Sequence, residues 1–285
     1  MKKLFIASFC LFSAFAANAQ KLDKGLLWKI SGNGITKPSY IFGTIHVTCD
    51  ATLEPNVIKA LADTKQLYLE LDMDDPKMQT SMMSTITMKD GKTMSSLVSA
   101  EDFKTLDAFM RKQTGMPASA INTFKPFIAT TFLLPKMLDC PIQSFEGELV
   151  KATKAQNEEI YGLETVEYQM GVFDAIPYEV QIGELLKSAK DDMAADKKEL
   201  ADMMAVYKAK DLNALYMFMA KSNNKMYSDY NDVLLDNRNK NWIPKIEEVA
   251  KATPTFFGVG AAHLAGENGV IMLLRKKGYK VEAAN

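Results

Sequence analysis

The chain has 285 residues, with 34 basic and 35 acidic side chains and a net charge of −1. No basic tract stands out, which argues against a nucleic-acid-binding protein. Beyond the N-terminal stretch, no apolar run reaches the length of a membrane span, and the length suits one large domain with a sizeable core.

The first nineteen residues have the pattern of a cleaved secretory signal. Two lysines near the start precede a mostly apolar stretch, and Ala17-Asn18-Ala19 offers small residues for cleavage before Gln20. We therefore expect a periplasmic or secreted protein with a domain over residues 20–285 and no stable membrane span after cleavage. An uncleaved anchor is the alternative, although the apolar stretch is short for a span.

In chain order, short apolar strands alternate with helices at both ends of the sequence. The predicted strands cover residues 27–31, about 39–47, 66–72, 159–164, 255–259 and 279–283. Short helices are predicted at about 55–64 and 267–277, and long helical stretches at about 76–156 and 178–252. The first two strands are expected to form a hairpin with a long loop around Gly32-Asn33-Gly34.

This order predicts an α/β protein with a central mixed sheet, in which the helical stretches form a large insertion folded over one edge. The two ends of the chain resemble half-repeats, because each contains a strand, a Gly-x-x-His turn, a helix and a second strand. The second strands carry acids, Glu70 in one half and Glu282 in the other.

The two histidines of the chain share one sequence frame. Gly43-Thr44-Ile45-His46 and Gly260-Ala261-Ala262-His263 each follow a β-prone run. A strand that ends in this way places imidazole at the carboxyl edge of the sheet, where open α/β sheets bind ligands. A single motif of this kind would favour a buried structural histidine. The duplication indicates function, because imidazole is the commonest metal ligand and titrates near neutral pH.

Two carboxylates, Glu70 and Glu164, are expected at the ends of buried strands. A carboxylate in such a place is costly unless it is paired, hydrogen-bonded or bound to a metal. With the two histidines, these acids form a ligand set that suits Zn²⁺ or Mn²⁺. Pairing of either acid with Lys125 or Arg238 is the alternative that the sequence leaves open.

Two cysteines, Cys49 and Cys140, follow the signal. In an oxidising compartment they can pair, but two separate buried thiols fit the sequence equally well. A third alternative places Cys49 in a metal site with His46. The methionine-rich segment over residues 78–94 indicates a pliable core or binding surface rather than soft-metal capture.

Several motifs together resemble the TraB/GumN family, which includes the Tiki metalloproteases. They are Leu27-Trp28-Lys29-Ile30, residues 40–46, 68–72, 162–165 and 258–264, together with Lys125-Pro126, Gln169, Arg238-Asn239 and Trp242. The resemblance implies an α/β core shared with erythromycin-esterase and haem-binding ChaN-like proteins. For the Tiki members it also implies divalent-metal-dependent peptide cleavage that needs both Gly-x-x-His histidines and the glutamates.

Carried over to this chain, the resemblance makes His46, His263, Glu70 and Glu164 the candidate metal site, with Glu70 and Glu164 also in catalytic roles. It further implies that Arg238 stabilises an anionic intermediate or orients a carboxylate. The leading hypothesis is a periplasmic or secreted hydrolase that uses a Mn, Co or Zn ion to cleave a peptide or protein substrate.

Two alternatives use the same residues differently. One is a non-enzymatic haem- or metal-binding protein that employs both histidines. The other is a partner-binding protein whose helical insertion makes the contacts. The sequence contains no Gly-x-Ser-x-Gly motif, so a Ser-His-Asp hydrolase is disfavoured.

Overall fold

A mixed sheet forms the centre of the fold. In the computed structural model, which describes residues 21–284, six strands pair in the order β4-β3-β5-β2-β1-β6. The strands are β1 (Leu27–Gly32), β2 (Ile35–Thr44), β3 (Gln66–Leu69), β4 (Glu159–Gly162), β5 (Phe256–Gly260) and β6 (Lys280–Ala283). β2, β3, β4 and β5 pair in parallel, whereas β1 is antiparallel to β2 and β6. The predicted α/β class with a mixed sheet is confirmed.

The hairpin of β1 and β2 is tighter than predicted. Gly32 pairs with Ile35, so the loop contains two residues, Asn33 and Gly34. Their φ angles are +46° and +89°, the backbone that a two-residue hairpin turn requires and that Asn-Gly adopts readily. The predicted long loop was wrong, because β2 begins with exposed residues such as Lys37 that lack the apolar pattern of its second half.

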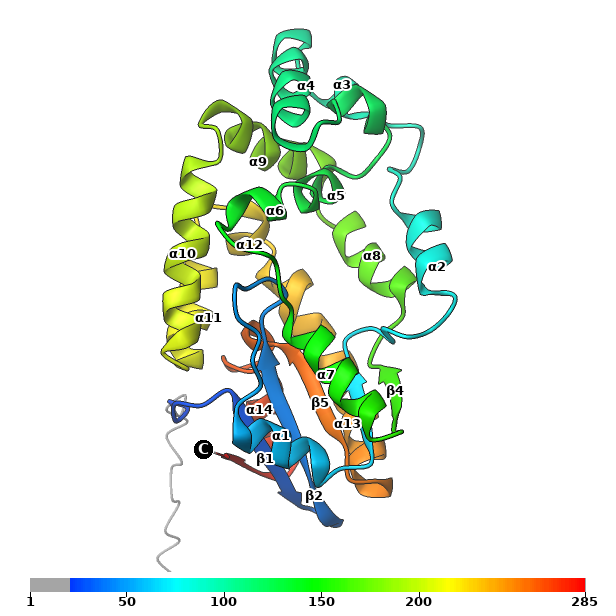
Figure 1. The fold of residues 1–285 in the computed structure, drawn as a ribbon, viewed down its shortest axis with the longest axis vertical. Coiled ribbons are helices and arrows are strands. Elements are labelled where there is room, and N and C mark those ends of the chain that lie inside the picture. Colours follow the sequence, from blue (N-terminus) through cyan, green and yellow to red (C-terminus); the bar gives the residue numbers. More distant parts are fainter. Residues whose placement is uncertain (1–20, 285) are drawn as a thin grey trace, which may run out of the picture.

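Four helices cover the two faces of the sheet. They are α1 (Pro55–Ala62), α7 (Phe145–Ala155), α13 (Asn237–Ala252) and α14 (Val270–Lys276). α1 lies between β2 and β3 in the chain and α7 between β3 and β4, so both belong to connections that run toward the β4 edge of the sheet. α13 lies between β4 and β5 and α14 between β5 and β6, so their connections run in the opposite direction. Since crossovers between parallel strands are right-handed, the two pairs lie on opposite faces, with α1 and α7 in front in Figure 1.

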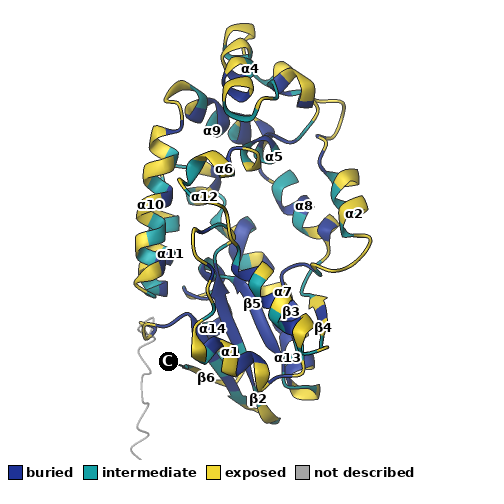
Figure 2. Cartoon of the chain, in the orientation of Figure 1, coloured by how far each residue is buried: buried dark blue, intermediate teal, exposed yellow. Residues whose placement is uncertain are grey.

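Apolar side chains fill the space between the sheet and these helices. Trp28, Ile41, Phe256 and Phe257 have no exposed surface, and the central part of the sheet is dark blue in Figure 2. Burial of one such side chain contributes about 1.5–3 kcal/mol. The residues that follow each strand therefore start from rigidly held positions.

A helical region lies beyond the carboxyl ends of the parallel strands (Figure 1). It contains α2 (Met78–Thr85), α3 (Met94–Leu97), α4 (Ala100–Thr114), α5 (Pro126–Thr131), α6 (Leu134–Met137), α8 (Val166–Asp174), α9 (Tyr178–Lys190), α10 (Ala194–Lys208), α11 (Leu212–Ala220) and α12 (Lys225–Ser228), with short helical turns at Ala118–Ile121 and Asp232–Asp236. Met94, Leu106 and Met110 are fully buried in a core of its own. Part of the methionine-rich segment is thus core, although Met83 is 62% exposed.

A disulfide joins two distant parts of the chain. Cys49, just after β2, is bonded to Cys140, just before α7, across a sequence separation of 91 residues. Their Cα atoms lie 5.6 Å apart, within the range that disulfides normally span. Of the three alternatives that the sequence leaves open, the structure shows the pair, so Cys49 offers no thiolate to a metal.

No helix among residues 21–284 is long and apolar enough to cross a membrane. The predicted signal peptide, residues 1–19, lies outside the described residues. Its cleavage and the periplasmic or secreted location stay predictions.

Candidate functional site

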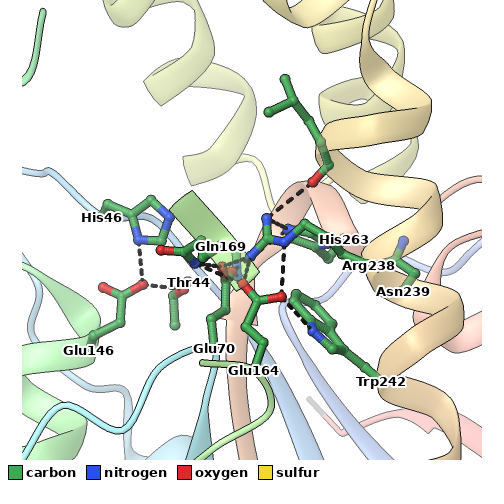
Figure 3. A network of polar contacts seen from close by, with 12 residues as sticks. Thr44, His46, Glu70, Glu146, Glu164, Gln169, Arg238, Asn239, Trp242 and His263 are labelled. Atoms are coloured by element: carbon green, nitrogen blue, oxygen red, sulfur yellow. Dashed lines mark hydrogen bonds and ion pairs between the residues drawn. The ribbon is translucent and has the colours of Figure 1, made fainter. Parts of the chain in front are cut away.

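The carboxyl ends of the parallel strands bring the predicted site residues together. His46 follows β2, Glu70 directly follows β3, Glu164 follows β4, and His263 lies in a short 3-10 turn after β5. Arg238, near the start of α13, reaches the same edge of the sheet (Figure 3). All five residues that sequence analysis selected therefore meet in one place, although 217 positions separate the two histidines.

His46 is held by a carboxylate that sequence analysis did not select. Its Nδ1 lies 2.8 Å from Oε1 of Glu146, on the first turn of α7. Glu146 also accepts hydrogen bonds from the hydroxyls of Thr44 at 2.6 Å and Ser144 at 2.9 Å. The carboxylate is therefore fixed by three donors, and its bond to Nδ1 turns the Nε2 of His46 away from α7, as Figure 3 shows.

Desolvation opposes a charge on His46, but the hydrogen bond and negative charge of Glu146 raise the pKa of His46 to about 9. The imidazole side chain is 68% exposed, so water reaches the ring and the carboxylate decides the direction of the shift. Burial likewise opposes the charge of Glu146, whose pKa is nevertheless lowered by His46 and Thr44. The two groups form a charged pair at neutral pH.

Glu70 occupies the middle of the site. Its Oε1 accepts a 2.8 Å hydrogen bond from the backbone N–H of Gly260, and its Oε2 accepts one of 2.5 Å from Arg238. Burial alone would raise the pKa of Glu70, but nearby positive charge, that of Arg238 above all, holds it well below its usual range. Glu70 is therefore an ionised carboxylate with little exposed surface.

Arg238 pairs with both candidate acids. Besides its bond to Glu70, it donates to the two oxygens of Glu164 at 2.5 and 3.2 Å. Glu164 also accepts from Trp242 at 3.0 Å and from Gln169 at 2.9 Å. Each oxygen of Glu164 thus accepts two hydrogen bonds. Arg238 donates to both oxygens, which is the bidentate arrangement that suits a guanidinium.

The pairing alternative that the sequence left open applies to Arg238 and not to Lys125. Lys125 is buried in the helical region, where its Nζ lies 2.9 Å from a carboxylate oxygen of Asp174. Asp174 ends α8, the helix that also carries Gln169. Lys125 therefore lies outside the candidate site.

His263 is buried and held at both ring nitrogens. Its Nδ1 lies 2.6 Å from Oδ1 of Asn239, and its Nε2 lies 3.0 Å from a terminal nitrogen of Arg238. The amide of Asn239 donates to the backbone oxygen of Asn268 at 2.9 Å, which leaves its oxygen facing the ring. The network thus assigns the proton to Nδ1 and the lone pair to Nε2.

Both imidazoles and Glu70 meet beside Gly260. The point that a Cβ atom of Gly260 would occupy lies 3.3 Å from Oε1 of Glu70, 3.6 Å from Cδ2 of His263 and 3.9 Å from Nε2 of His46. A Cβ atom here would be tight against Glu70 and in ordinary van der Waals contact with the two imidazoles, so a larger side chain would fill the space between them. Glycine keeps the space between them clear, which explains its place in the second Gly-x-x-His motif.

The two histidines and Glu70 are donor types that divalent cations accept. Each histidine is bound at Nδ1 by an oxygen, from Glu146 or from Asn239, and this is how proteins orient metal-binding imidazoles. No group of three or more His, Cys, Asp or Glu side chains among residues 21–284 lies in a ready metal-binding arrangement. In addition, the guanidinium of Arg238 lies 3.0 Å from Nε2 of His263 and occupies the lone pair that a metal ion would need.

The burial of His263 predicts a pH-dependent stability. Burial, assisted by the charges of Arg238 and His46 and opposed by Glu70, lowers the pKa of His263 to about 3. Between the ordinary value near 6.5 and this one, the unfolded chain binds a proton that the folded protein does not. The free energy of unfolding should fall as pH drops through this window, by about 1.4 kcal/mol per pH unit for this group.

Denaturant unfolding at pH 6.5 and 5 measures this effect, for which we expect a loss of about 2 kcal/mol from His263. A His263→Asn variant lacks the titrating ring and should lose less over the same interval. Equal losses in the two proteins would contradict a neutral, buried His263.

Glu146 is the site residue that sequence analysis missed. It lies 100 positions from His46 and belongs to no Gly-x-x-His motif. It is also not at the end of an apolar run, the feature that drew attention to Glu70 and Glu164. Asn239, Gln169 and Trp242 were recognised as family positions, but their contacts were not foreseen.

The chain matches the family model described as the TraB/PrgY/gumN family over residues 26–283. The chain belongs to the TraB/PrgY/gumN family. This confirms the resemblance that the separate motifs indicated. The matched region includes all the residues of the site described above.

The metalloprotease TIKI2 of Danio rerio is 20% identical to this family member over 319 aligned residues. The match covers 93% of this chain and 62% of the relative, so the chain spans less than two thirds of that protein. No solved structure was found to match the chain.

Proposed function

We propose that this protein is a divalent-metal-dependent hydrolase that cleaves peptide bonds in a peptide or protein substrate. The observation that carries the proposal is the pair of imidazoles beside Glu70. Each is held at Nδ1 by an oxygen acceptor, and both lie within 4 Å of the same point at the carboxyl edge of the sheet.

His46, His263 and Glu70 are the residues that would hold the ion, and their donor types suit Mn²⁺, Co²⁺ or Zn²⁺. For His263 this requires that Arg238 release Nε2. When bound, such an ion polarises a carbonyl group and lowers the pKa of a coordinated water. Glu146 and Asn239 keep the two imidazoles in the orientation described above. Glu70 is ionised at neutral pH, the form that binds a cation or accepts a proton.

Arg238 and Glu164 hold Glu70 in position. The guanidinium holds Glu70 in place through its 2.5 Å bond and is itself held by both oxygens of Glu164. We assign Glu164 the role of positioning Arg238, because no oxygen of Glu164 lacks a donor. The N–H groups of Arg238 all donate to protein acceptors, so we assign Arg238 the role of orienting the carboxylate of Glu70 rather than of binding a reacting oxygen.

Two further lines support the proposal. A relative by sequence, TIKI2, is named a metalloprotease, and the site residues lie in the region shared by the family. The signal-like N-terminus and the Cys49–Cys140 disulfide agree with a periplasmic or secreted location, since disulfides persist in oxidising compartments.

Metal content and peptide cleavage together test the function. Purified wild-type protein, His46→Ala and His263→Ala are compared for bound metal and for cleavage of a peptide library with Mn²⁺, Co²⁺ or Zn²⁺, each against a chelated sample. We expect metal-dependent cleavage by the wild type and loss of both metal and activity in each variant. Met83→Ala, on the exposed side of α2, is the matched control and should retain both.

Equal metal content in all four proteins would refute the ligand assignment. Metal binding without cleavage of any peptide would refute the hydrolase. A stable Soret shift on addition of haem, lost in the two histidine variants, would favour the non-enzymatic haem-binding alternative.

A further inference from the structure

Two loops meet beside the His46–Glu146 pair. One covers residues 45–54, follows β2 and carries His46; the other covers residues 138–144 and leads into α7. The Cys49–Cys140 disulfide joins them covalently. The bond lies three residues after His46 and six residues before Glu146, so it is close in sequence to both members of the pair.

The same two loops are also joined by hydrogen bonds. Thr48 and Gln143 exchange two backbone bonds of 3.0 and 2.8 Å. The side-chain oxygen of Gln143 accepts a further bond of 3.0 Å from the N–H of Ala51. The disulfide therefore closes a small antiparallel contact between the loops.

The two members of the pair are anchored differently. Glu146 belongs to α7, whose Phe145 and Leu149 are part of the sheet core, and it accepts a hydrogen bond from Thr44 at the end of β2. Its position therefore depends mainly on the sheet core, although Ser144 of the second loop also donates to it. His46 lies beyond the end of β2 with a side chain that is 68% exposed, so its loop must be held in place by other contacts.

The His46 loop itself packs on the sheet core through Ala51, Ile45 and Leu53, but the second loop adds little apolar burial to the contact between them. Residues 139–143 of the second loop are all exposed or half-buried. Ile142, the large apolar side chain of this segment, is 38% exposed. Without the covalent bond, the contact between the loops would depend mainly on the hydrogen bonds around Gln143, each of which contributes only about 1 kcal/mol or less where water competes.

We propose that the Cys49–Cys140 disulfide is a positioning element of the candidate site, which holds the loop that places His46 against Glu146. The oxidised protein has the complete pair, and reduction loosens it. A dithiol reductant can reach the exposed Cys49; the S–S bond is then replaced by two protein thiols, and the dithiol is oxidised to its own disulfide. The proposal concerns the placement of His46 and holds whether or not the protein cleaves peptides.

The sequence makes this proposal directly measurable, because the chain contains two histidines. In the full chain without added metal, imidazole ¹H–¹⁵N spectra report the Nδ1–H groups of His46 and His263 separately. We expect a dithiol to shift or broaden the signals of His46 and to leave those of His263 unchanged, since Asn239 on α13 holds the latter. Reoxidation should restore the first spectrum.

Two variants serve as controls. The C49S/C140S protein should show the His46 signals of the reduced wild type and should not respond to the dithiol. Gln143→Ala keeps the disulfide but removes the side-chain bond to Ala51, and its His46 signals should stay close to those of the wild type. A shift in Gln143→Ala as large as that on reduction would overturn the assignment to the disulfide.

Unchanged His46 signals in a sample with two titrated thiols would also overturn the proposal. Equal changes at both histidines, or unfolding on reduction, would count against it as well, because the disulfide would then hold the fold as a whole. If the proposed function is correct, C49S/C140S should in addition bind Zn²⁺ about ten-fold more weakly. Absence of peptidase activity would leave the spectroscopic test valid.

Discussion

An Arg238→Met variant is expected to lose about 3–5 kcal/mol of unfolding free energy, because a buried ion pair that loses one partner leaves an uncompensated charge. Arg238 is 8% exposed, and its carboxylate partners Glu70 and Glu164 are 10% and 3% exposed. Methionine fills most of the volume but donates no hydrogen bond, so two buried carboxylates would share one site without a cation. Denaturant unfolding at pH 7 measures the loss.

Two further variants separate charge from packing at this position. Arg238→Lys keeps the charge but cannot donate in the bidentate manner, so we expect a smaller loss than with methionine. In R238M/E70Q/E164Q, the carboxylates are neutral as well, and a large part of the lost stability should return. If the triple variant is no more stable than R238M, the loss comes from packing and not from unpaired charge.

A Glu146→Ala variant should bind a divalent metal about 10- to 100-fold more weakly, which is the usual effect of removing the group that orients a metal-binding imidazole. Glu146 holds Nδ1 of His46 at 2.8 Å. Without it the exposed ring can rotate, and its Nε2 no longer faces Glu70. Titration of the metal-free protein with Zn²⁺ or Mn²⁺ gives the affinity.

Glu146→Gln is the matched control for this experiment. Its amide oxygen can still accept from Thr44 and from Nδ1–H of His46, so the affinity should fall less than in Glu146→Ala. Equal affinities in the wild type and in Glu146→Ala would show that His46 is oriented by other contacts or does not bind the metal.

The fold class could be predicted from local sequence patterns. Apolar runs such as the one before Gly43 and turn pairs such as Asn33-Gly34 act over a few residues, and they placed most strands within a few positions of their observed bounds. The hairpin loop was the error. β2 starts with exposed polar residues, and tertiary pairing with β1 extends the strand beyond its apolar half.

The candidate site was predictable in part for the same reason. His46 and His263 share a motif, and Glu70 and Glu164 end apolar runs, so each could be recognised in its local context. Parallel pairing of the strands then explains why they meet. Nothing local distinguishes Glu146 from the other exposed-looking acids of the helical stretches, and it was therefore missed.

By itself, the sequence determined which residues end the strands and which of them carry imidazole or carboxylate groups. The tertiary structure alone decided their partners: Glu146 for His46, both acids for Arg238, and Cys140 for Cys49. The alternation of side chains along a strand and the chemistry of a turn are determined within a few residues. Contacts across 70 to 170 positions depend on how α7 and α13 dock on the sheet, and that packing is set by the whole core at once.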